Sequence, residues 1–110
     1  MRKFLALALL LAAGCTVMGT ERVEGWPKLT VVEHYVPHHE MRDRCGKYLG
    51  PFMSPEACAE FDFAHLRCDI WFSADFPPSA FIVNHERQHC AGYDHEGEHE
   101  LRDVLARYSK

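Results

Sequence analysis

An eleven-residue stretch near the C-terminus constrains the fold more than any other part of the chain. It runs from residue 85 to residue 95 and reads HERQHCAGYDH. Residues four apart lie on the same face of a helix, so His85 and His89 can present two imidazoles on one side. Gly92 adopts a positive φ at little cost, so it can end that helix and turn the chain back. The stretch therefore predicts a helix, a turn and a returning segment that brings His95 beside the other two histidines.

Three converging imidazoles predict a metal site. Zinc takes four ligands, so a site built from His85, His89 and His95 leaves one position open for water, which is typical of a catalytic site. Glu86 stands beside these ligands in the sequence. Its carboxylate is not needed as a ligand, so it can take a proton from the zinc-bound water as that water attacks a carbonyl.

Two other ligand sets are open at this point. If Gly92 does not turn the chain back, the third ligand would come from the residues that follow His95, namely Glu96, Glu98 or His99. Cys90 is a further alternative, although one residue past His89 its side chain points about 100° away around the helix.

The spacing HExxHxxGxxH resembles the zinc signature of the metzincin endopeptidases at all five defining positions. The resemblance implies a zinc-dependent peptidase with one zinc per chain, His85, His89 and His95 as ligands, and Glu86 as general base. Metzincins also carry a methionine turn after the third histidine, and this chain has no methionine after Met53. The hydrophobic base beneath the metal would therefore come from another element.

The first fourteen residues predict a signal peptide. Two basic residues precede an apolar run over residues 4–13, which is too short to span a bilayer as a stable helix. Small residues then lead to Cys15, in a pattern that resembles a bacterial lipobox. The resemblance implies cleavage before Cys15 and lipidation of that residue, which would anchor the protein to a membrane without crossing it. The alternative is an ordinary cleaved signal that ends near a cysteine.

The predicted location is the bacterial cell envelope. Residue 16 is threonine rather than aspartate, which by analogy with Gram-negative sorting favours the outer membrane, facing the periplasm. Cleavage would remove two of the twelve basic residues and none of the sixteen acidic ones, which leaves a net charge of −6. No basic patch indicates a nucleic-acid partner.

Four cysteines besides Cys15 predict two disulfides, because an exported domain of about 95 residues buries only a modest core. Three pairings are possible. We prefer Cys45 with Cys58 and Cys68 with Cys90, since the second pair would join the strand before the metal helix to that helix.

The pattern along the chain predicts a small, disulfide-stapled α+β domain over residues 28–110, joined to the anchor by an irregular tether over residues 15–27. We expect strands over residues 29–36 and 63–72, an irregular segment or at best a short helix over 38–55, a short helix over 54–60 and the metal helix over 79–91. By the metzincin resemblance, the strand over residues 63–72 borders the cleft and an extended substrate adds to its edge. The alternative is that this strand is simply the central strand of the sheet.

An amphipathic helix is predicted from residue 96 or 97 to residue 108. Leu101, Val104, Leu105 and Tyr108 recur at helical spacing and form one apolar stripe. We expect this helix to close the metal site from below, in place of the methionine turn.

These features predict a membrane-anchored zinc peptidase that hydrolyses a peptide bond in a peptide or protein substrate. A related possibility is an amidase-like hydrolase that acts on cell-wall peptides. The alternative from another class is a non-enzymatic, metal-binding envelope lipoprotein that acts as an interaction module. A structural site of that kind would fill its fourth position, for example with Glu98 or His99.

Replacing Cys15 with alanine is expected to abolish lipid attachment, because the lipobox offers no second thiol. Labelled palmitate should be incorporated by the parent chain in a Gram-negative host and not by the Cys15→Ala variant. Thr16→Ala keeps the cysteine and is expected to label like the parent. Labelling of Cys15→Ala at the parent level would contradict the prediction that Cys15 is the lipidated residue.

Overall fold

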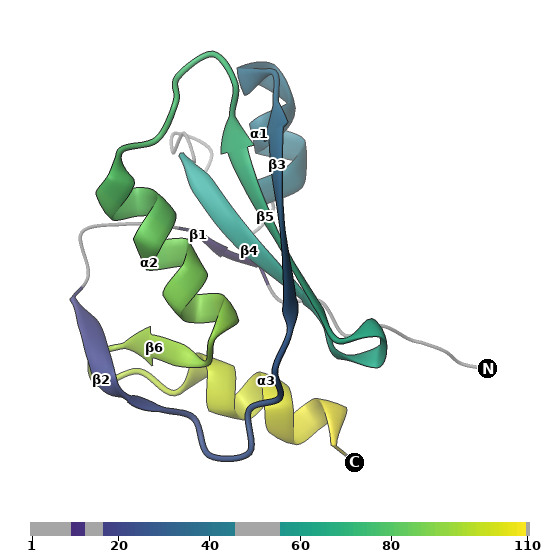
Figure 1. Cartoon of the computed structure of the whole chain (residues 1–110), viewed down its shortest axis with the longest axis vertical. Helices are drawn as coiled ribbons and strands as arrows, with labels where there is room; N and C mark the ends of the chain where they lie inside the picture. Colours follow the sequence, from purple (N-terminus) through teal and green to yellow (C-terminus); the bar gives the residue numbers. More distant parts are fainter. Residues whose placement is uncertain (1–9, 13–16, 46–55, 110) are drawn as a thin grey trace.

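The chain folds around a four-stranded mixed sheet and a separate two-stranded ribbon (Figure 1). The computed structural model describes residues 10–12, 17–45 and 56–109. The sheet runs in the order β1 (Leu10–Ala12), β4 (Ala57–Asp62), β5 (Arg67–Ser73) and β3 (Thr30–Val36). All neighbours are antiparallel except β3, which is parallel to β5. The ribbon pairs β2 (Met18–Arg22) with β6 (Tyr93–His95), and the predicted α+β class is confirmed.

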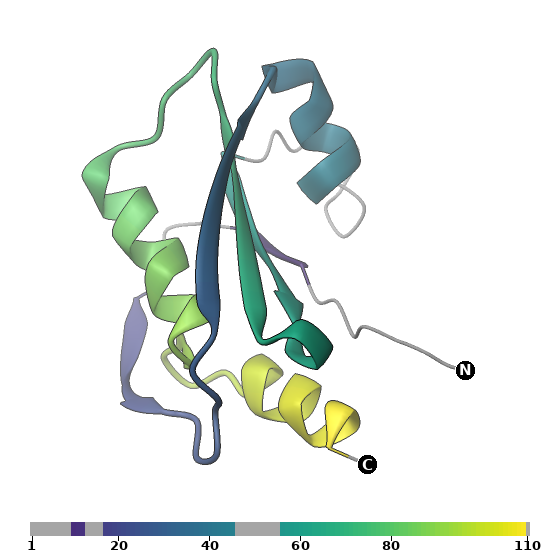
Figure 2. The same cartoon turned by 45° about the vertical axis from the view of Figure 1, so that its right-hand side comes forward.

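Two helices lie on opposite faces of the sheet (Figure 2). Successive residues of a strand point to opposite faces. Ala59 and Ile70 accordingly belong to the main core, against which α2 (Ala80–Cys90) packs. Cys58 and Trp71 point the other way, into a smaller cluster with α1 (His38–Cys45). Both central strands are therefore covered on their two faces.

The main core is completed by α3 (Glu100–Tyr108) and by Trp26. Leu101 of α3 is fully buried in this core. The Trp26 ring lies edge-on to the rings of Phe61 and Phe63, with centroids 5.3 and 5.1 Å away. Aromatic pairs in this arrangement contribute about 0.5–1.5 kcal/mol beyond their buried area. Trp26 thus joins the segment after β2 to the end of β4.

Several predictions from sequence are confirmed. The helix predicted over residues 79–91 is α2, and Ser79 caps it by accepting a hydrogen bond from the Ile82 amide at 3.3 Å. The strand predicted over residues 29–36 is β3, which ends before Pro37. Both preferred disulfides are present, Cys45–Cys58 and Cys68–Cys90.

The strand predicted over residues 63–72 begins later than expected. Phe63–His65 forms a 3₁₀ turn, capped by the Asp62 carboxylate, and Leu66 follows in the left-handed region at φ 51°. β5 starts only at Arg67 and is paired on both sides. The interpretation of this strand as the one with a free edge for substrate is therefore wrong, and the alternative of a central strand is correct.

Two helix predictions need correction. The short helix predicted over residues 54–60 is wrong, because Ala57–Asp62 forms β4; residues 54 and 55 lie outside the described residues. The segment over residues 38–55 begins with the short helix α1, and residues 46–55 lie outside the described residues. The C-terminal helix begins at Glu100, after a turn at Gly97 with φ +80°.

The irregular tether predicted over residues 15–27 is also wrong for its described part. Met18–Arg22 forms β2, and Trp26 is buried in the core. The domain therefore begins about ten residues earlier than the predicted boundary at residue 28. Leu10–Ala12 lies within the predicted signal peptide and pairs with β4 in the full chain. None of the helices in the described residues is both long and apolar enough to span a membrane.

Removing the Cys68–Cys90 disulfide by a double change to alanine is expected to lower the free energy of unfolding by about 3 kcal/mol, because its loop of 22 residues is freed in the unfolded state. Denaturant unfolding measures the loss. The Cys45–Cys58 double variant is the matched control, with a similar expected loss. Only the Cys68–Cys90 variant should also weaken metal binding, since Cys90 follows His89. Equal metal affinity in both variants would show that the Cys68–Cys90 disulfide does not help to position the histidines.

Candidate metal centre

The helix α2 carries three of the residues that the sequence singled out. His85 and His89 lie one helical turn apart, with ring centroids separated by 4.8 Å. Glu86 lies on the same buried part of the helix, and all three side chains are almost completely inaccessible to solvent. A helix with such polar residues on its buried face needs partners for them, because unpaired polar groups in a core are costly.

The turn at Gly92 ends this helix and reverses the chain. Gly92 has φ +97°, a conformation that only glycine adopts without strain. Trp26 lies directly against it: an added Cβ would come within 2.6 Å of the Trp26 Cγ. The Trp26 indole N–H also donates to the Cys90 carbonyl at 2.9 Å. Glycine is therefore required here for its backbone conformation and for the space that the indole fills.

After the turn, β6 returns His95 to the helix. The rings of His85 and His95 have centroids 5.1 Å apart, and those of His89 and His95 4.7 Å. One nitrogen from each of the three histidines lies within 4.8 Å of the other two. The three side chains that the sequence predicted as ligands are brought together, and the group can hold a metal ion.

Two of the three imidazoles are oriented by hydrogen bonds on the outer side of the ring. The His89 Nδ1–H donates to the Tyr93 carbonyl at 2.9 Å, and the His95 Nδ1–H donates to the Glu98 carboxylate at 3.1 Å. A hydrogen on Nδ1 leaves the lone pair on Nε2. Metal-bound histidines are commonly held in this way by a carbonyl or carboxylate.

The buried part of α2 contains polar atoms without partners. The described residues offer no hydrogen bond to His85 Nδ1, His89 Nε2 or either carboxylate oxygen of Glu86. The Nε2 atoms of His85 and His95 are 3.1 Å apart, which requires a hydrogen on one of them or a shared cation between them. Buried nitrogen lone pairs that face one another suit a divalent metal with a preference for imidazole.

Burial also shifts the protonation of these groups. It lowers the pKa of His89 to about 4, and it lowers the pKa of His85, with a smaller contribution from His95. Both imidazoles are therefore neutral near pH 7, as metal ligands must be. Burial raises the pKa of Glu86 to about 8. A carboxyl group with such a pKa exchanges a proton readily near neutral pH.

The alternative ligand sets are not assembled. Cys90 is not available as a ligand, because it forms the disulfide with Cys68. Glu98 contacts the outer nitrogen of His95, on the side of the ring opposite Nε2. His99 is exposed at the start of α3, where it makes no side-chain cap. Among the described residues, His95 is the third member of the histidine group.

Asp94 joins the metal-binding strand to the next helix. Its carboxylate accepts the His95 amide at 2.8 Å and the Leu101 amide at 3.0 Å. Leu101 is fully buried, so α3 is packed into the core next to β6. The helix α3 therefore supports His95 indirectly, through the hydrogen bonds of Asp94 and through the core.

A groove of about 560 Å³ adjoins His95 on its outer side. It lies between β2 with its following turn on one side and the segment from Asp94 to His99 on the other. Glu98 lines this groove, and its carboxylate accepts the hydrogen bond from His95 Nδ1. His95 lines this groove close to the β2–β6 ribbon, whereas the buried His85 and His89 do not.

Sequence reasoning missed Trp26, Asp94 and the pairing of Met18 with His95 across the ribbon. The sequence predicts Glu98 only as a metal ligand, in the third or the fourth position, although its place three residues after His95 is a signal for a contact with that ring. Trp26 gave no such signal, because it stands in a segment without helical or strand periodicity.

The chain matches no protein-family model, no curated protein and no solved structure.

Gly92→Ala is expected to lower the free energy of unfolding by roughly 3 kcal/mol or more, because it adds both backbone strain and a clash with the Trp26 ring. Thermal or denaturant unfolding measures the change. Gly97→Ala is the matched control: Gly97 also has positive φ, but an added Cβ would meet nothing within 4 Å, so about 1–2 kcal/mol is expected. Equal losses would show that contact with Trp26 does not restrict residue 92.

Proposed function

We propose that the protein is a membrane-anchored zinc peptidase with a metzincin-like centre. One observation supports this most directly: α2 buries a carboxylate, Glu86, that has no partner among the described residues, and the same helix carries two of the three histidines whose nitrogens converge. A core carboxylate without a partner has a high cost in stability, so a role in chemistry accounts for its presence. The resemblance at positions 85, 86, 89, 92 and 95 supports the same conclusion.

The donor set favours zinc over harder cations. His85, His89 and His95 offer only nitrogen, whereas magnesium and calcium prefer oxygen. Three protein ligands leave one position for water or substrate, as in catalytic zinc sites. When bound there, zinc would polarise the carbonyl of the scissile bond and lower the pKa of a water molecule.

Glu86 would move the proton. Its pKa of about 8 is set by burial in the absence of a cation, and a nearby positive charge favours the ionised form. The ionised carboxylate can accept a proton from the attacking water and then deliver it to the leaving amine. Glu86 follows His85 directly on α2, in the buried part of that helix.

The position of the centre on α2 suggests where an extended substrate lies. Arg87 donates to Glu33 of β3 at 2.6 Å, so that flank of α2 faces β3. Residues advance by 100° along a helix, which places His85 and His89 on roughly the opposite flank of α2, away from β3. The outer edge of β4 is paired with Leu10–Ala12 in the full chain. Cleavage of the signal peptide would free this edge, and a substrate strand can then pair there.

Metal content and peptide hydrolysis, measured together on the full-length chain, test the proposal. The parent is expected to hold one zinc and to cleave peptides from a mixed library. Glu86→Gln should retain zinc and lose about 10²- to 10⁴-fold in kcat, since it cannot accept the proton. Glu96→Gln removes a charge from an exposed residue of the neighbouring loop and should change neither property.

Three results would contradict the proposal. Absence of zinc from the parent would exclude the metal centre. Full activity in Glu86→Gln would exclude the general base. One zinc in both chains, without hydrolysis of any peptide or cell-wall substrate, would favour a metal-binding interaction module instead.

A further inference from the structure

We propose that this centre works at the membrane surface, on polypeptide segments held close to the bilayer. The inference rests on the proposed function and on lipidation at Cys15, and it adds the substrate class. It follows from the first folded residues of the domain, which pair with the strand that carries the third histidine.

The chain between the anchor and the centre is very short. Met18 of β2 lies directly opposite His95 of β6 in the ribbon. The Val17 carbonyl also accepts the Glu96 amide at 2.8 Å, so residue 17 is already tied to the loop after His95. Thr16 alone stands between Cys15 and that tied residue.

Covalent geometry limits the distance from the bilayer. Three residues of fully extended chain span at most about 10 Å, so Met18 lies within that distance of the lipidated residue. Residues opposite one another in an antiparallel pair have Cα atoms about 4.5–5.5 Å apart. His95 therefore lies within roughly 15 Å of Cys15, whatever the orientation of the domain. A free tether of thirteen residues, as the sequence first suggested, would have allowed about 45 Å.

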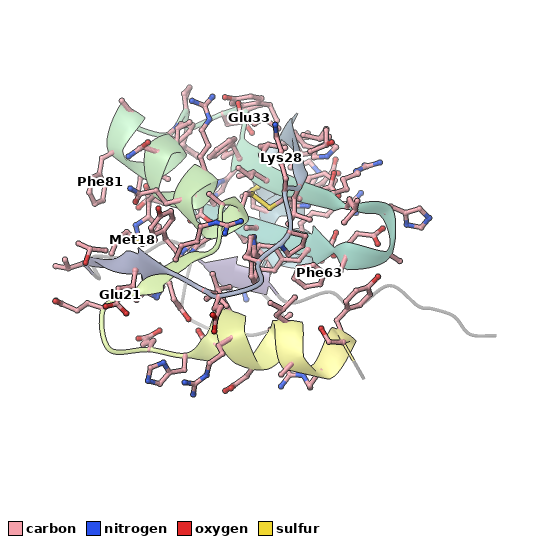
Figure 3. All side chains as sticks on the ribbon, turned by 60° about the horizontal axis from the view of Figure 1, so that its bottom comes forward. Met18, Glu21, Lys28, Glu33, Phe63 and Phe81 are labelled. Atoms are coloured by element: carbon pink, nitrogen blue, oxygen red, sulfur yellow. A yellow bond between two sulfur atoms is a disulfide. The ribbon has the colours of Figure 1, made fainter. Side chains whose placement is uncertain are left out.

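One exposed apolar side chain lies beside this attachment and another beside His85. Val17 is 67% exposed, and Phe81, one turn before His85, is 63% exposed with its ring centroid 6.0 Å from that of His85. Figure 3 shows Phe81 and Met18 on the same side of the molecule, away from the C-terminal end of α3. Exposed apolar side chains beside a lipid anchor suit the interface of a bilayer.

The acidic residues of the neighbouring loop, Glu96 and Glu98, favour contact at the surface over deep insertion, because anionic lipid head groups repel them. The centre then faces chains that emerge from the membrane. A catalytic site far from the anchor, on a large soluble domain, would not reach those segments.

The test presents one peptide at two heights on vesicles of phosphatidylethanolamine and phosphatidylglycerol. The peptide is the best substrate from the library assay, joined to lipid through a two-residue spacer or through twenty prolines, which hold it about 60 Å away. The lipidated parent is expected to cleave the near peptide at least tenfold faster. A twenty-residue Gly/Ser insertion between Thr16 and Val17 should abolish this preference. The same insertion after Lys110 should leave it intact.

A second readout does not depend on turnover. Cobalt(II) in the histidine group should quench a fluorophore on the lipid head groups of these vesicles, and the insertion after Thr16 should relieve the quenching. The zinc-loaded chain serves as the control without quenching.

The possible failures are distinguishable. Equal cleavage at both heights by the parent, or equal quenching with and without the insertion, would overturn this inference alone. Strong quenching without cleavage of any peptide would overturn the peptidase and support the placement of the centre at the bilayer. A chain that binds neither metal would overturn both.

Discussion

The turn at Gly92, packed beneath Trp26, is the contact on which the rest of the site depends. It sets the angle at which β6 leaves α2, and so decides whether His95 reaches the two helical histidines. Trp26 holds the turn in three ways: it fills the space above the glycine, it donates to the Cys90 carbonyl, and it packs on Phe61 and Phe63. The position of the third histidine is thus fixed by the hydrophobic core, with little freedom left to the loop itself.

The interior of the site is unfavourable for folding in the absence of a cation. Each buried polar atom without a partner costs about 1–3 kcal/mol, and the described residues leave four such atoms around His85, Glu86 and His89. A domain of this size has a total stability of only 5–15 kcal/mol. Zinc binding supplies apparent free energies of about 10–16 kcal/mol in small zinc-finger domains, and a metal held by this histidine group would offset that cost. The Cys68–Cys90 disulfide also restrains the ligands, since it joins the metal helix to the central strand β5.

The sequence predicted those parts of the structure whose signals are local. The ends of α2 follow from the Ser79 cap and from Gly92, and the histidine spacing follows from helical geometry. The strand β4 was mistaken for a helix because Ser54, Pro55 and Glu56 resemble a helix start. Both faces of β4 are buried here: Cys58 points to one face, and Ala57 and Ala59 point to the other. The sequence therefore shows no alternation of apolar and polar residues that would indicate a strand.

The ribbon was beyond prediction for a different reason. β2 and β6 pair across more than seventy residues, and neither strand has a hydrophobic period of its own. Their pairing is stabilised by what surrounds it: Arg22 donates to the Ala91 carbonyl, Trp26 fills the turn, and Asp94 links β6 to α3. A segment without local preference was therefore interpreted as a tether, although tertiary contacts make it part of the site.

The proposed lipid attachment would also bear on how so small a domain could act on a polypeptide. Larger peptidases use a second subdomain to form a cleft and to hold the substrate through many contacts, whereas the described residues form one small domain. Confinement to a surface can replace part of that binding, because two partners attached to the same membrane meet at a raised effective concentration, of millimolar order for short flexible links. Each extra residue between Cys15 and β2 would dilute this advantage. The immediate pairing of Met18 with His95 is therefore consistent with a centre that obtains its selectivity from position as much as from contacts.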